Sequence, residues 1–542
     1  MLEWTGSRRR LFRLAIAGAA ALLVPRAGAV RPESLVSDVR VESAVPFLGD
    51  NPFLATLGGV VGRTTARLRF RLARPAVVTL ETLVTGQGVA SEQLATVGQT
   101  GLATRRVSLD AGRHSLEWSP DPTMPARTYI LRLKAQVRGG PVAGFRTRAS
   151  VSSVVRVLGV DAGFVARSAV SGQRARLVVR TDARVLTVHV IHCGPEPEPT
   201  YSNNELKGVP ITEPSDVDWS TKGNRPASVD VSVADWPSGL YAVRLEADDG
   251  RVGFAPLVVR PAAPTQRIAI VLPTTTWQAY NFYDGDGDGW GDTWYARWKT
   301  THMDLSRPHA NRGVPYRFRS YDLGFLHWLY RTKRQFDVYA DEDIERFPNP
   351  AALRAAYDLL VFPGHTEYVT TRVYDLVSGF RDRGGNLVFL SANNFFRRVD
   401  RDGQTLRLVD EWRDLRRPEA ALCGVQYLAS DRGERHAPFT VTGADVAPWA
   451  FDETGLENGS QFGLYGIEID SRAPSSPPQT QVLARIPDLF GSGRSAEMTY
   501  YEHSSGARVF SAGVLNFGGQ VLIWPEATQL LENVWRRLAP ES

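Results

Sequence analysis

Three carboxylates at alternate positions, Asp284, Asp286 and Asp288, are each followed by a glycine. Carboxylates at this spacing can wrap their oxygens around a hard cation such as calcium. Counted from Asp284 as an EF-hand-like loop, Asp292 takes the ninth position and Tyr295 the twelfth, where a bidentate glutamate normally completes the shell. The pattern predicts a weak calcium loop that takes its remaining ligands from elsewhere. The alternative is an acidic, glycine-rich surface turn without metal.

A second group of reactive side chains follows three predicted strands. Tyr280, His365, Glu367 and Asn393 each lie a few residues beyond a short apolar run. Because the carboxyl ends of parallel strands meet at one edge of a sheet, we expect these side chains to converge on one cleft. Glu367 can serve as a metal ligand or a general base, and His365 as a proton donor or oxyanion stabiliser. Each residue alone is more often a hydrogen-bonded structural residue, and their shared position favours function.

The elements that must position these residues have the pattern of an α/β domain. The apolar runs Ile268–Leu272, Leu359–Phe362 and Leu387–Leu390 predict strands buried on both faces of a parallel sheet. Between the last two, apolar residues at helical spacing from Val373 to Phe380 predict a helix, which gives a βαβ unit. We therefore predict an α/β domain over residues 263–542, with the calcium loop inside it.

The chain before residue 263 predicts β-structure. In the run 66–72 apolar residues alternate with arginines, which places one face in a core and the other in water. Similar short strands separated by turn residues predict two immunoglobulin-like β-sandwich domains, at 30–150 and 151–262. The proline- and alanine-rich segment Arg260–Pro264 indicates a linker before the α/β domain.

Residues 1–29 predict an export signal peptide. Three arginines, Arg8–Arg10, precede an apolar run, and Ala27, Gly28 and Ala29 form a small-x-small cleavage site. Arg9 and Arg10 fit the twin-arginine form of the signal. The apolar run is shorter than the ~20 residues that a membrane span needs. We expect a periplasmic or extracellular protein with no membrane span after signal removal.

Length, charge and cysteine content limit the number of domains and the kinds of partner that this protein can have. The chain has 542 residues, which predicts several compact units, and its 63 basic and 58 acidic residues give a net charge of only +5. This balance gives no argument for a nucleic-acid partner. Cys193 and Cys423 form no disulfide framework, and their pairing stays open. The oligomeric state also stays open, and a homo-oligomer is compatible with the sequence.

Several of these residues lie in motifs that resemble a known family. The motifs look like the C-terminal domain of the large (beta) subunit of N,N-dimethylformamidase and its relatives, over roughly residues 151–538: Thr276–Asn281, Ser306–Pro308, Gly364–Tyr368, Gly384–Asn386, Asn393 and Arg508–Gly513. The resemblance implies a fold similar to class I glutamine amidotransferases without their cysteine nucleophile. It also implies an iron ion, held by two tyrosines and a glutamate, that activates water for amide hydrolysis.

Residue by residue, the resemblance covers part of that site. Tyr280 and Glu367 match one tyrosine and the glutamate. His365 and Asn393 match residues that handle substrate, and the resemblance implies that they stabilise the developing oxyanion.

The second tyrosine is replaced in this chain. Where relatives read Arg-Pro-Tyr, this chain has His309, which is chemically a good ligand for iron or zinc. Tyr321 or Tyr316 can instead supply the phenol from nearby. Glu502 loosely resembles a further acidic residue of the family.

We therefore expect an exported, metal-dependent hydrolase of amide or related C–N bonds that acts on a small amide-like molecule. The alternative is a non-catalytic, calcium-stabilised surface or ligand-binding protein that keeps the fold with a decayed active site. A carbohydrate-active protein is a third reading, and the sequence offers no paired-carboxylate signature for it.

Overall fold

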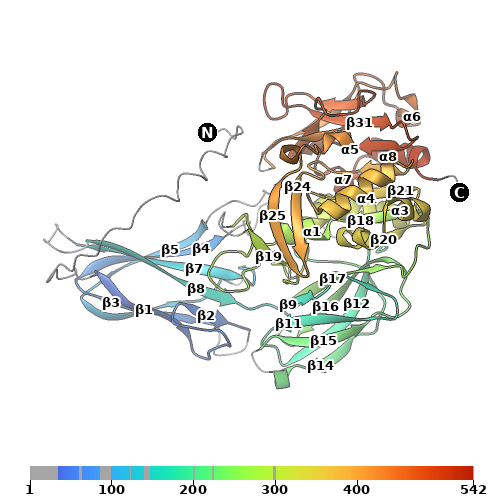
Figure 1. Ribbon diagram of the computed structural model, residues 1–542. Coiled ribbons are helices and arrows are strands. Elements are labelled where there is room, and N and C mark those ends of the chain that lie inside the picture. The colour runs from blue at the N-terminus through green and yellow to red at the C-terminus, as the bar shows by residue number, and fades with distance from the viewer. Residues whose placement is uncertain are drawn as a thin grey trace, which may run out of the picture.

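The fold is described from a computed structural model, which shows two β-sandwiches (blue and green) and an α/β unit (yellow to red; Figure 1). The structure describes residues 34–59, 64–85, 99–121, 124–138, 147–198, 202–222, 225–296, 301–431 and 433–540. The predicted export signal, residues 1–29, lies outside them. Within the described residues, no helix is long and apolar enough to cross a membrane.

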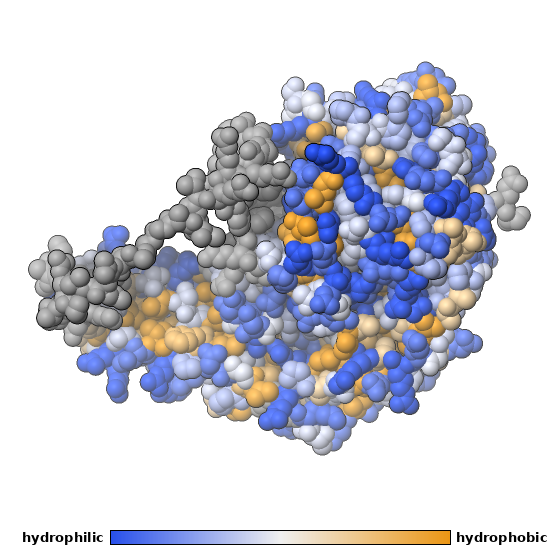
Figure 2. All heavy atoms as spheres, in the orientation of Figure 1, coloured by the Kyte–Doolittle hydropathy of each residue, from blue (hydrophilic) through white to orange (hydrophobic). Residues whose placement is uncertain are grey.

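The first unit packs two sheets face to face. One contains β1 (Val36–Ser43), β3 (Ala66–Leu72) and β6 (Gly112–Trp118); the other contains, in order, β2 (Leu54–Leu57), β8 (Arg148–Val157), β7 (Thr128–Val137), β4 (Ala76–Thr85) and β5 (Gln99–Leu109). Apolar residues of β3 are buried and its arginines exposed, as the alternation predicts. On the face drawn in Figure 2, hydrophobic residues gather on this sandwich.

The first sandwich extends further along the chain than the sequence predicts. Strand β8 pairs with β7 from Arg148 to Arg156, so the predicted boundary at residue 150 falls inside a strand of this unit. The apolar residues of β8 pack into the same core as those of β3, which is why the strand belongs here. The second unit therefore begins only after β8.

The second unit is also a sandwich. One sheet contains, in order, β10 (Ser168–Val170), β17 (Val252–Arg260), β16 (Gly239–Ala247), β12 (Val185–Cys193) and β13 (Val209–Pro210), with β14 (Ser215–Asp218) paired to β12; the other contains β15 (Ala227–Ser232), β11 (Arg174–Arg180) and β9 (Asp161–Phe164). A short 3-10 helix, Ser220–Lys222, follows β14. Leucines and valines from both sheets form its core.

The third unit is built on a nine-stranded sheet. Its order is β20 (Asp337–Ala340), β18 (Ile268–Leu272), β21 (Leu359–Phe362), β23 (Asn386–Phe389), β32 (Arg508–Ser511), β31 (Ala496–Glu502), β30 (Gln481–Ile486), β27 (His436–Val441) and β28 (Gln461–Gly466). The first five strands are parallel and the rest antiparallel. The three strands predicted from fully apolar runs all lie in the parallel half.

Helices cover both faces of the parallel half. Ile268, Ile270 and Leu272 of β18 pack toward α2 (Gly324–Arg331) and α8 (Pro525–Leu538). The alternate residues Ala269 and Val271 pack toward α3 (Pro350–Ala356) and α4 (Thr371–Arg381). This arrangement explains why β18 is apolar at every position.

Smaller elements complete the unit and frame its functional edge. One four-stranded sheet contains β19 (His302–Asp304), β25 (Thr405–Glu411), β24 (Arg397–Asp402) and β22 (Tyr368–Val369), and β26 (Gln426–Ser430) pairs with β29 (Glu468–Ser471). The remaining helical segments are α1 (Thr274–Ala279), a π-helical turn (Arg319–Leu323), 3-10 turns (Asp341–Arg346 and Arg413–Leu415), α5 (Ala420–Cys423), α6 (Pro448–Phe451) and α7 (Phe517–Gln520).

The second sandwich and the α/β unit share one core. Cys193 and Leu240 of the sandwich belong to the same buried cluster as Trp328 of α2. Cys423 lies in the cluster on the opposite face of the nine-stranded sheet. Both cysteines are buried and free, so the fold depends on packing and not on a disulfide.

Candidate functional site

The carboxyl ends of three parallel strands meet at the candidate site. Tyr280 ends α1, which follows β18, while His365 and Glu367 lie in the loop after β21, and Asn393 lies in the loop after β23. All four side chains are buried, with exposed fractions of 6% or less. The structure brings these four predicted residues together, because neighbouring parallel strands deliver their loops to one edge of the sheet.

Glu367 is the centre of the cluster. The Tyr280 hydroxyl donates a hydrogen bond of 2.7 Å to Oε2 of Glu367, and the Tyr295 hydroxyl lies 3.4 Å from the same oxygen. Nε2 of His365 lies 3.5 Å from it. On the other oxygen, Nε of Arg397 approaches to 4.0 Å. Two phenols, an imidazole and a guanidinium thus surround one buried carboxylate.

A second buried carboxylate, Glu468 of β29, was not predicted. Its Oε2 lies 3.6 Å from Nε2 of His365 and accepts a hydrogen bond of 2.9 Å from Nδ2 of Asn393. The one sequence signal is that Glu468 stands between two isoleucines, Ile467 and Ile469, in a short strand-like segment. Buried acids without a cation beside them point to function more often than exposed ones.

Burial sets the protonation of the cluster. It raises the pKa of Glu367 to about 7 and the pKa of Glu468 well above its ordinary range, since each charge loses its hydration. Burial lowers the pKa of His365 to about 3, so its ring is neutral near pH 7. Near neutral pH, Glu367 can therefore gain or lose a proton, while burial favours the protonated form of Glu468 and the neutral form of His365.

The tyrosines form a stack beside the carboxylate. The Tyr280 ring lies 4.5 Å from that of Tyr295 and 5.4 Å from that of Tyr316, in stacked geometry. The Tyr295 hydroxyl is also hydrogen-bonded to the Tyr368 hydroxyl. Burial raises the pKa of Tyr280, Tyr295 and Tyr368 well above the ordinary value, so that each stays a phenol unless a cation is bound.

Three buried polar atoms in this region lack a hydrogen-bond partner among the described residues: Nε2 of His365, Oη of Tyr321 and Oδ1 of Asn393. Buried polar atoms are almost always paired in folded proteins, so each exception calls for an explanation, such as strain, a catalytic role, or a water or ion bound there. Phenol and carboxylate oxygens together suit a hard Lewis-acidic cation. The side chains present therefore fit the iron site that the resemblance implies.

The candidates for the second metal-binding tyrosine separate in space. Tyr321, on the π-helical turn, has its unpaired hydroxyl in the site region, and its ring lies 6.4 Å from that of His365. Tyr295, which the sequence analysis placed only in the calcium loop, contacts Glu367. Tyr316 stacks on Tyr280 from one side.

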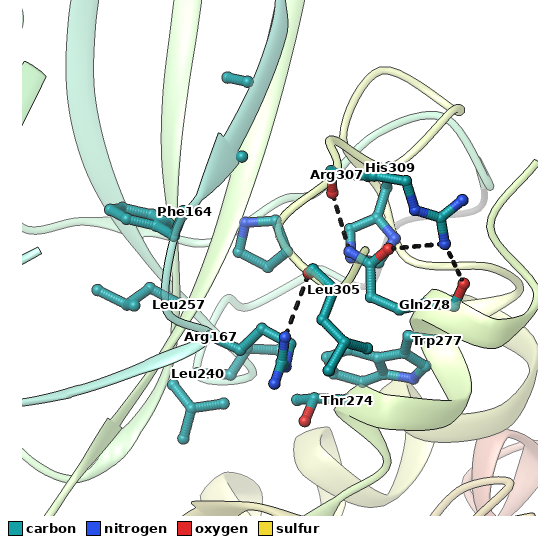
Figure 3. Close-up of a pocket in the computed structure, with 14 residues that line it drawn as sticks. Phe164, Arg167, Leu240, Leu257, Thr274, Trp277, Gln278, Leu305, Arg307 and His309 are labelled. Carbon is teal, nitrogen blue, oxygen red and sulfur yellow. Dashed lines mark hydrogen bonds between the residues drawn. The ribbon is translucent and has the colours of Figure 1, made fainter. Parts of the chain in front are cut away.

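His309 lies in a different pocket, between the second sandwich and α1 (Figure 3). Its ring is beside Arg307 and Arg167, and burial together with these charges lowers its pKa to about 3. Arg167 reaches into this pocket from the sandwich and donates a hydrogen bond of 3.2 Å to the Leu305 carbonyl. His309 is not one of the residues that the structure places around Glu367.

Glu502 lies at the surface. Its side chain is 51% exposed and pairs with Arg537 at 2.9 Å and with Arg508 at 3.7 Å. Glu468, and not Glu502, is the additional acid beside His365 and Asn393.

The Asp-Gly loop brings three of its four predicted ligands together. Carboxylate oxygens of Asp284, Asp286 and Asp292 come within 4.8 Å of one another, and Asp288 stands outside this group. Asp284 also accepts hydrogen bonds from the backbone amides of Gly287 and Gly289, at 2.7 and 2.8 Å. Burial raises the pKa of Asp284 to about 7.

The same loop joins the first sandwich to the α/β unit. The Thr85 hydroxyl of β4 donates a hydrogen bond of 2.6 Å to the Gly289 carbonyl. A Cβ atom on Gly287 would lie 2.5 Å from Leu54, and one on Gly289 would lie 2.7 Å from Ile130. Both glycines have positive φ, of 76° and 88°. Gly287 and Gly289 are therefore required by the sandwich as well as by the turn.

Comparisons with known proteins add a family. The family described as N,N-dimethylformamidase beta subunit-like, C-terminal, matches residues 196–526, more than half of the chain and including the whole cluster around Glu367. No curated protein matches the chain.

Among solved structures, a Salmonella alpha-2-macroglobulin mutant is 11% identical with a TM-score of 0.22, covering 42% of this chain and 17% of its own. E. coli alpha-2-macroglobulin activated by porcine elastase is 10% identical with a TM-score of 0.23, covering 44% of this chain and 24% of its own. The mmIFT52 N-terminal domain is 13% identical with a TM-score of 0.24, covering 38% of this chain and 86% of its own. These TM-scores are too low to carry a conclusion about fold or function.

Proposed function

We propose that this chain, which belongs to the N,N-dimethylformamidase beta subunit-like family, is a metal-dependent hydrolase of amide or related C–N bonds. The observation that carries the proposal is a buried cluster of four side chains. Glu367 accepts a hydrogen bond of 2.7 Å from Tyr280, and Nε2 of His365 lies 3.5 Å from Glu367 and 3.6 Å from Glu468. Burying so many titratable groups together lowers the stability of the fold, and such clusters are typical of catalytic sites.

Tyr280, Glu367 and Tyr321 are the proposed ligands of an iron ion or another transition metal such as zinc. Tyr321 is preferred to His309 because its ring lies 6.4 Å from that of His365, whereas His309 lines another pocket. When bound, the metal polarises the amide carbonyl and lowers the pKa of water.

His365 and Glu468 are placed to move protons. Hydrolysis breaks the C–N bond, adds a hydroxyl to the acyl carbon and adds a proton to the departing nitrogen. Glu468 can hold a proton, since burial raises its pKa well above the ordinary range. It lies 3.6 Å from Nε2 of the neutral His365 ring. A proton released by the attacking water can therefore pass through this pair to the leaving nitrogen.

The fold implied by the family resemblance, similar to class I glutamine amidotransferases, is part of the same proposal for residues 263–542. Its support is the parallel half-sheet with helices on both faces. The site lies at the carboxyl ends of those strands, where open α/β sheets bind ligands.

Export and calcium binding belong to the proposal as well. The signal-like segment 1–29 supports export to the periplasm or outside the cell. Calcium would be held by Asp284, Asp286 and Asp292, and the loop that carries them runs from Tyr280 to Tyr295, both beside Glu367. Calcium at this loop would order the segment that carries the two phenols.

Amine release from a panel of small amides by purified residues 30–542 tests the function. Wild-type protein should release amine, and Glu367→Gln should not, because a neutral amide is a poor ligand and cannot replace the carboxylate. Release from no amide in the panel by a folded, metal-loaded protein would contradict the hydrolase and favour a binding protein with a decayed site.

A further inference from the structure

The three-stranded sheet of the first sandwich presents arginines to solvent. Its central strand, β3, buries alternate apolar residues and exposes Arg67, Arg69 and Arg71 between them. The neighbouring strands place Arg40 of β1 and Arg113 of β6 on the same side of the sheet, since each lies opposite one of these arginines. These five exposed residues are called the arginine face below.

The arginine face sets like charges beside each other. Arg69 lies directly opposite Arg40 where β3 pairs with β1. Arg71 lies directly opposite Arg113 where β3 pairs with β6. Like charges at opposite positions on paired strands lower the stability of a sheet. The repulsion among these side chains therefore favours a partner that carries negative charge.

Glutamates neutralise only part of this charge. Arg67 pairs with Glu117 at 3.0 Å, and Arg69 pairs with Glu42 at 2.6 Å. The other three arginines of the face form no ion pair with a carboxylate of the described residues. The arginine face therefore keeps an excess of positive charge.

The whole first sandwich is more basic than the rest of the chain. Residues 34–157 contain 16 basic and 8 acidic residues, whereas the full chain contains 63 and 58. The excess of basic residues in this one unit is larger than the net charge of +5 of the whole chain. Positive charge is therefore concentrated in the first sandwich, and such a concentration attracts anionic partners.

The arginine face is turned away from the α/β unit. The contacts of the Asp-Gly loop with Thr85, Leu54 and Ile130 of the first sandwich all fall on the five-stranded sheet. In Figure 1, β1 and β3 lie on the far side of the sandwich from the α/β unit. A partner can therefore reach the arginine face without displacing that unit.

We propose that the arginine face binds an acidic polysaccharide, whose carboxylate or sulfate groups pair with the guanidinium groups. Two parallel N–H bonds from one guanidinium match the oxygens of such a group, which makes arginine the preferred side chain for it. From Arg67 to Arg71, β3 advances about 13 Å, so an extended polymer can contact all three arginines of this strand at once. This inference goes beyond the proposed function and does not depend on it.

The composition of the face favours a polysaccharide over an anionic membrane. Glu42 and Glu117 lie among the arginines, where the hydroxyl groups of a sugar can donate hydrogen bonds to them. The continuous negative charge of an anionic membrane would instead repel both carboxylates. Among the described residues, no strand of this sheet exposes a large hydrophobic side chain for insertion into a bilayer.

Binding to two acidic polysaccharides, polygalacturonate and chondroitin sulfate, tests the proposal, with dextran as the uncharged polymer. Isothermal titration calorimetry of residues 30–542 measures the affinity at about 0.15 M ionic strength. The face variant carries Arg40→Gln, Arg71→Gln and Arg113→Gln. Because these three residues have no carboxylate partner, the variant loses no ion pair and is relieved of like-charge repulsion, so it should fold.

The control variant carries Arg106→Gln, Lys134→Gln and Arg148→Gln. These exposed residues line a surface hollow on the five-stranded sheet, the other sheet of the same sandwich. Both variants lose three positive charges from one sandwich, and they differ in the face that loses them. Charges farther apart than the Debye length, about 8 Å at this ionic strength, are largely screened.

Wild type should bind at least one acidic polysaccharide and not dextran. The face variant should bind it at least about tenfold more weakly, and the control variant should stay within about threefold of wild type. Binding to neither acidic polysaccharide, or equal binding to dextran, would overturn the inference, and binding to phosphatidylglycerol vesicles alone would make the partner a membrane surface. Unchanged binding by the face variant, or an equally large loss in the control variant, would also overturn it, because this face would then not be the site.

Discussion

Replacing Gly289 by alanine tests how the Asp-Gly loop joins the first sandwich to the α/β unit. Gly289 has a φ of 88°, and a Cβ atom there would lie 2.7 Å from Cγ1 of Ile130 and 3.1 Å from Cγ2 of Val154. The variant therefore meets two separate costs. One is the left-handed backbone, and the other is the collision with the sheet of the sandwich.

The two costs can be separated by a control. Placing alanine in left-handed backbone costs about 1–2 kcal/mol, and overpacking a buried contact costs about 1–3 kcal/mol more. Gly250 has a φ of 82°, and a Cβ atom there meets nothing within 4 Å. Gly250→Ala should therefore lose only the backbone part, while Gly289→Ala should lose about 2–5 kcal/mol.

Urea unfolding of both variants, followed by tryptophan fluorescence, measures how far each substitution lowers the free energy of unfolding at the first transition. Limited proteolysis provides a second readout, since a loosened first sandwich should be cleaved from Gly289→Ala sooner than from Gly250→Ala. Equal stability of the two variants would show that the loop is not pressed against Ile130 and Val154, and would refute the reasoning.

Three further outcomes are expected. Burial raises the pKa of Asp322 to about 8, so the free energy of unfolding of the wild type should fall as pH rises from about 4 to about 8, whereas that of Asp322→Asn should not. The stability of Asp322→Asn relative to wild type should therefore increase across this range. Urea unfolding at several pH values measures the difference, and a difference that does not change with pH contradicts the prediction. Asp286→Asn should abolish the rise in Tm that ~1 mM calcium gives the wild type, and a wild-type Tm that calcium does not change argues against the calcium loop. If Tyr321 is the second metal ligand, Tyr321→Phe should shift or remove the visible absorption band that a phenolate bound to ferric iron gives, and Tyr295→Phe should leave the band unchanged. Visible spectra of the iron-loaded variants measure the band. The opposite result makes Tyr295 the second ligand.

Local pattern predicted the elements on which the site stands. Strand β18 is apolar at every position because both faces of the sheet are covered, and Val373 and Phe380 lie on the buried face of α4 as their spacing indicates. The convergence of Tyr280 and Glu367 followed from the rule that parallel strands deliver their carboxyl ends to one edge.

The other members of the cluster depend on contacts that sequence periodicity does not encode. Glu468 comes from β29, which pairs with β26 outside the nine-stranded sheet, and it reaches His365 only through the fold of the whole unit. Tyr295 sits where an EF-hand-like loop would have its glutamate, and its contact with Glu367 spans 72 positions in the sequence.

Two further differences between the predictions and the structure also come from contacts between segments that are distant in the sequence or that local pattern does not specify. The glycines of the Asp-Gly repeat contact a sandwich that begins more than 200 residues earlier, as the bond between Thr85 and Gly289 shows. Strand β8 crosses the predicted boundary at residue 150 because its partner is β7, a choice that alternation within β8 cannot specify.

The most direct test of the central claim is the transition-metal content of purified residues 30–542, measured by elemental analysis beside amidase activity for wild type, Glu367→Gln and Glu502→Gln. Glu367 lies within the tyrosine cluster, and Glu502 lies at the surface with Arg537. We predict about one equivalent of iron or another transition metal in wild type and in Glu502→Gln, and loss of both metal and activity in Glu367→Gln. A Glu367→Gln protein that keeps its metal and its activity, or a wild-type protein that holds calcium alone, would contradict the account.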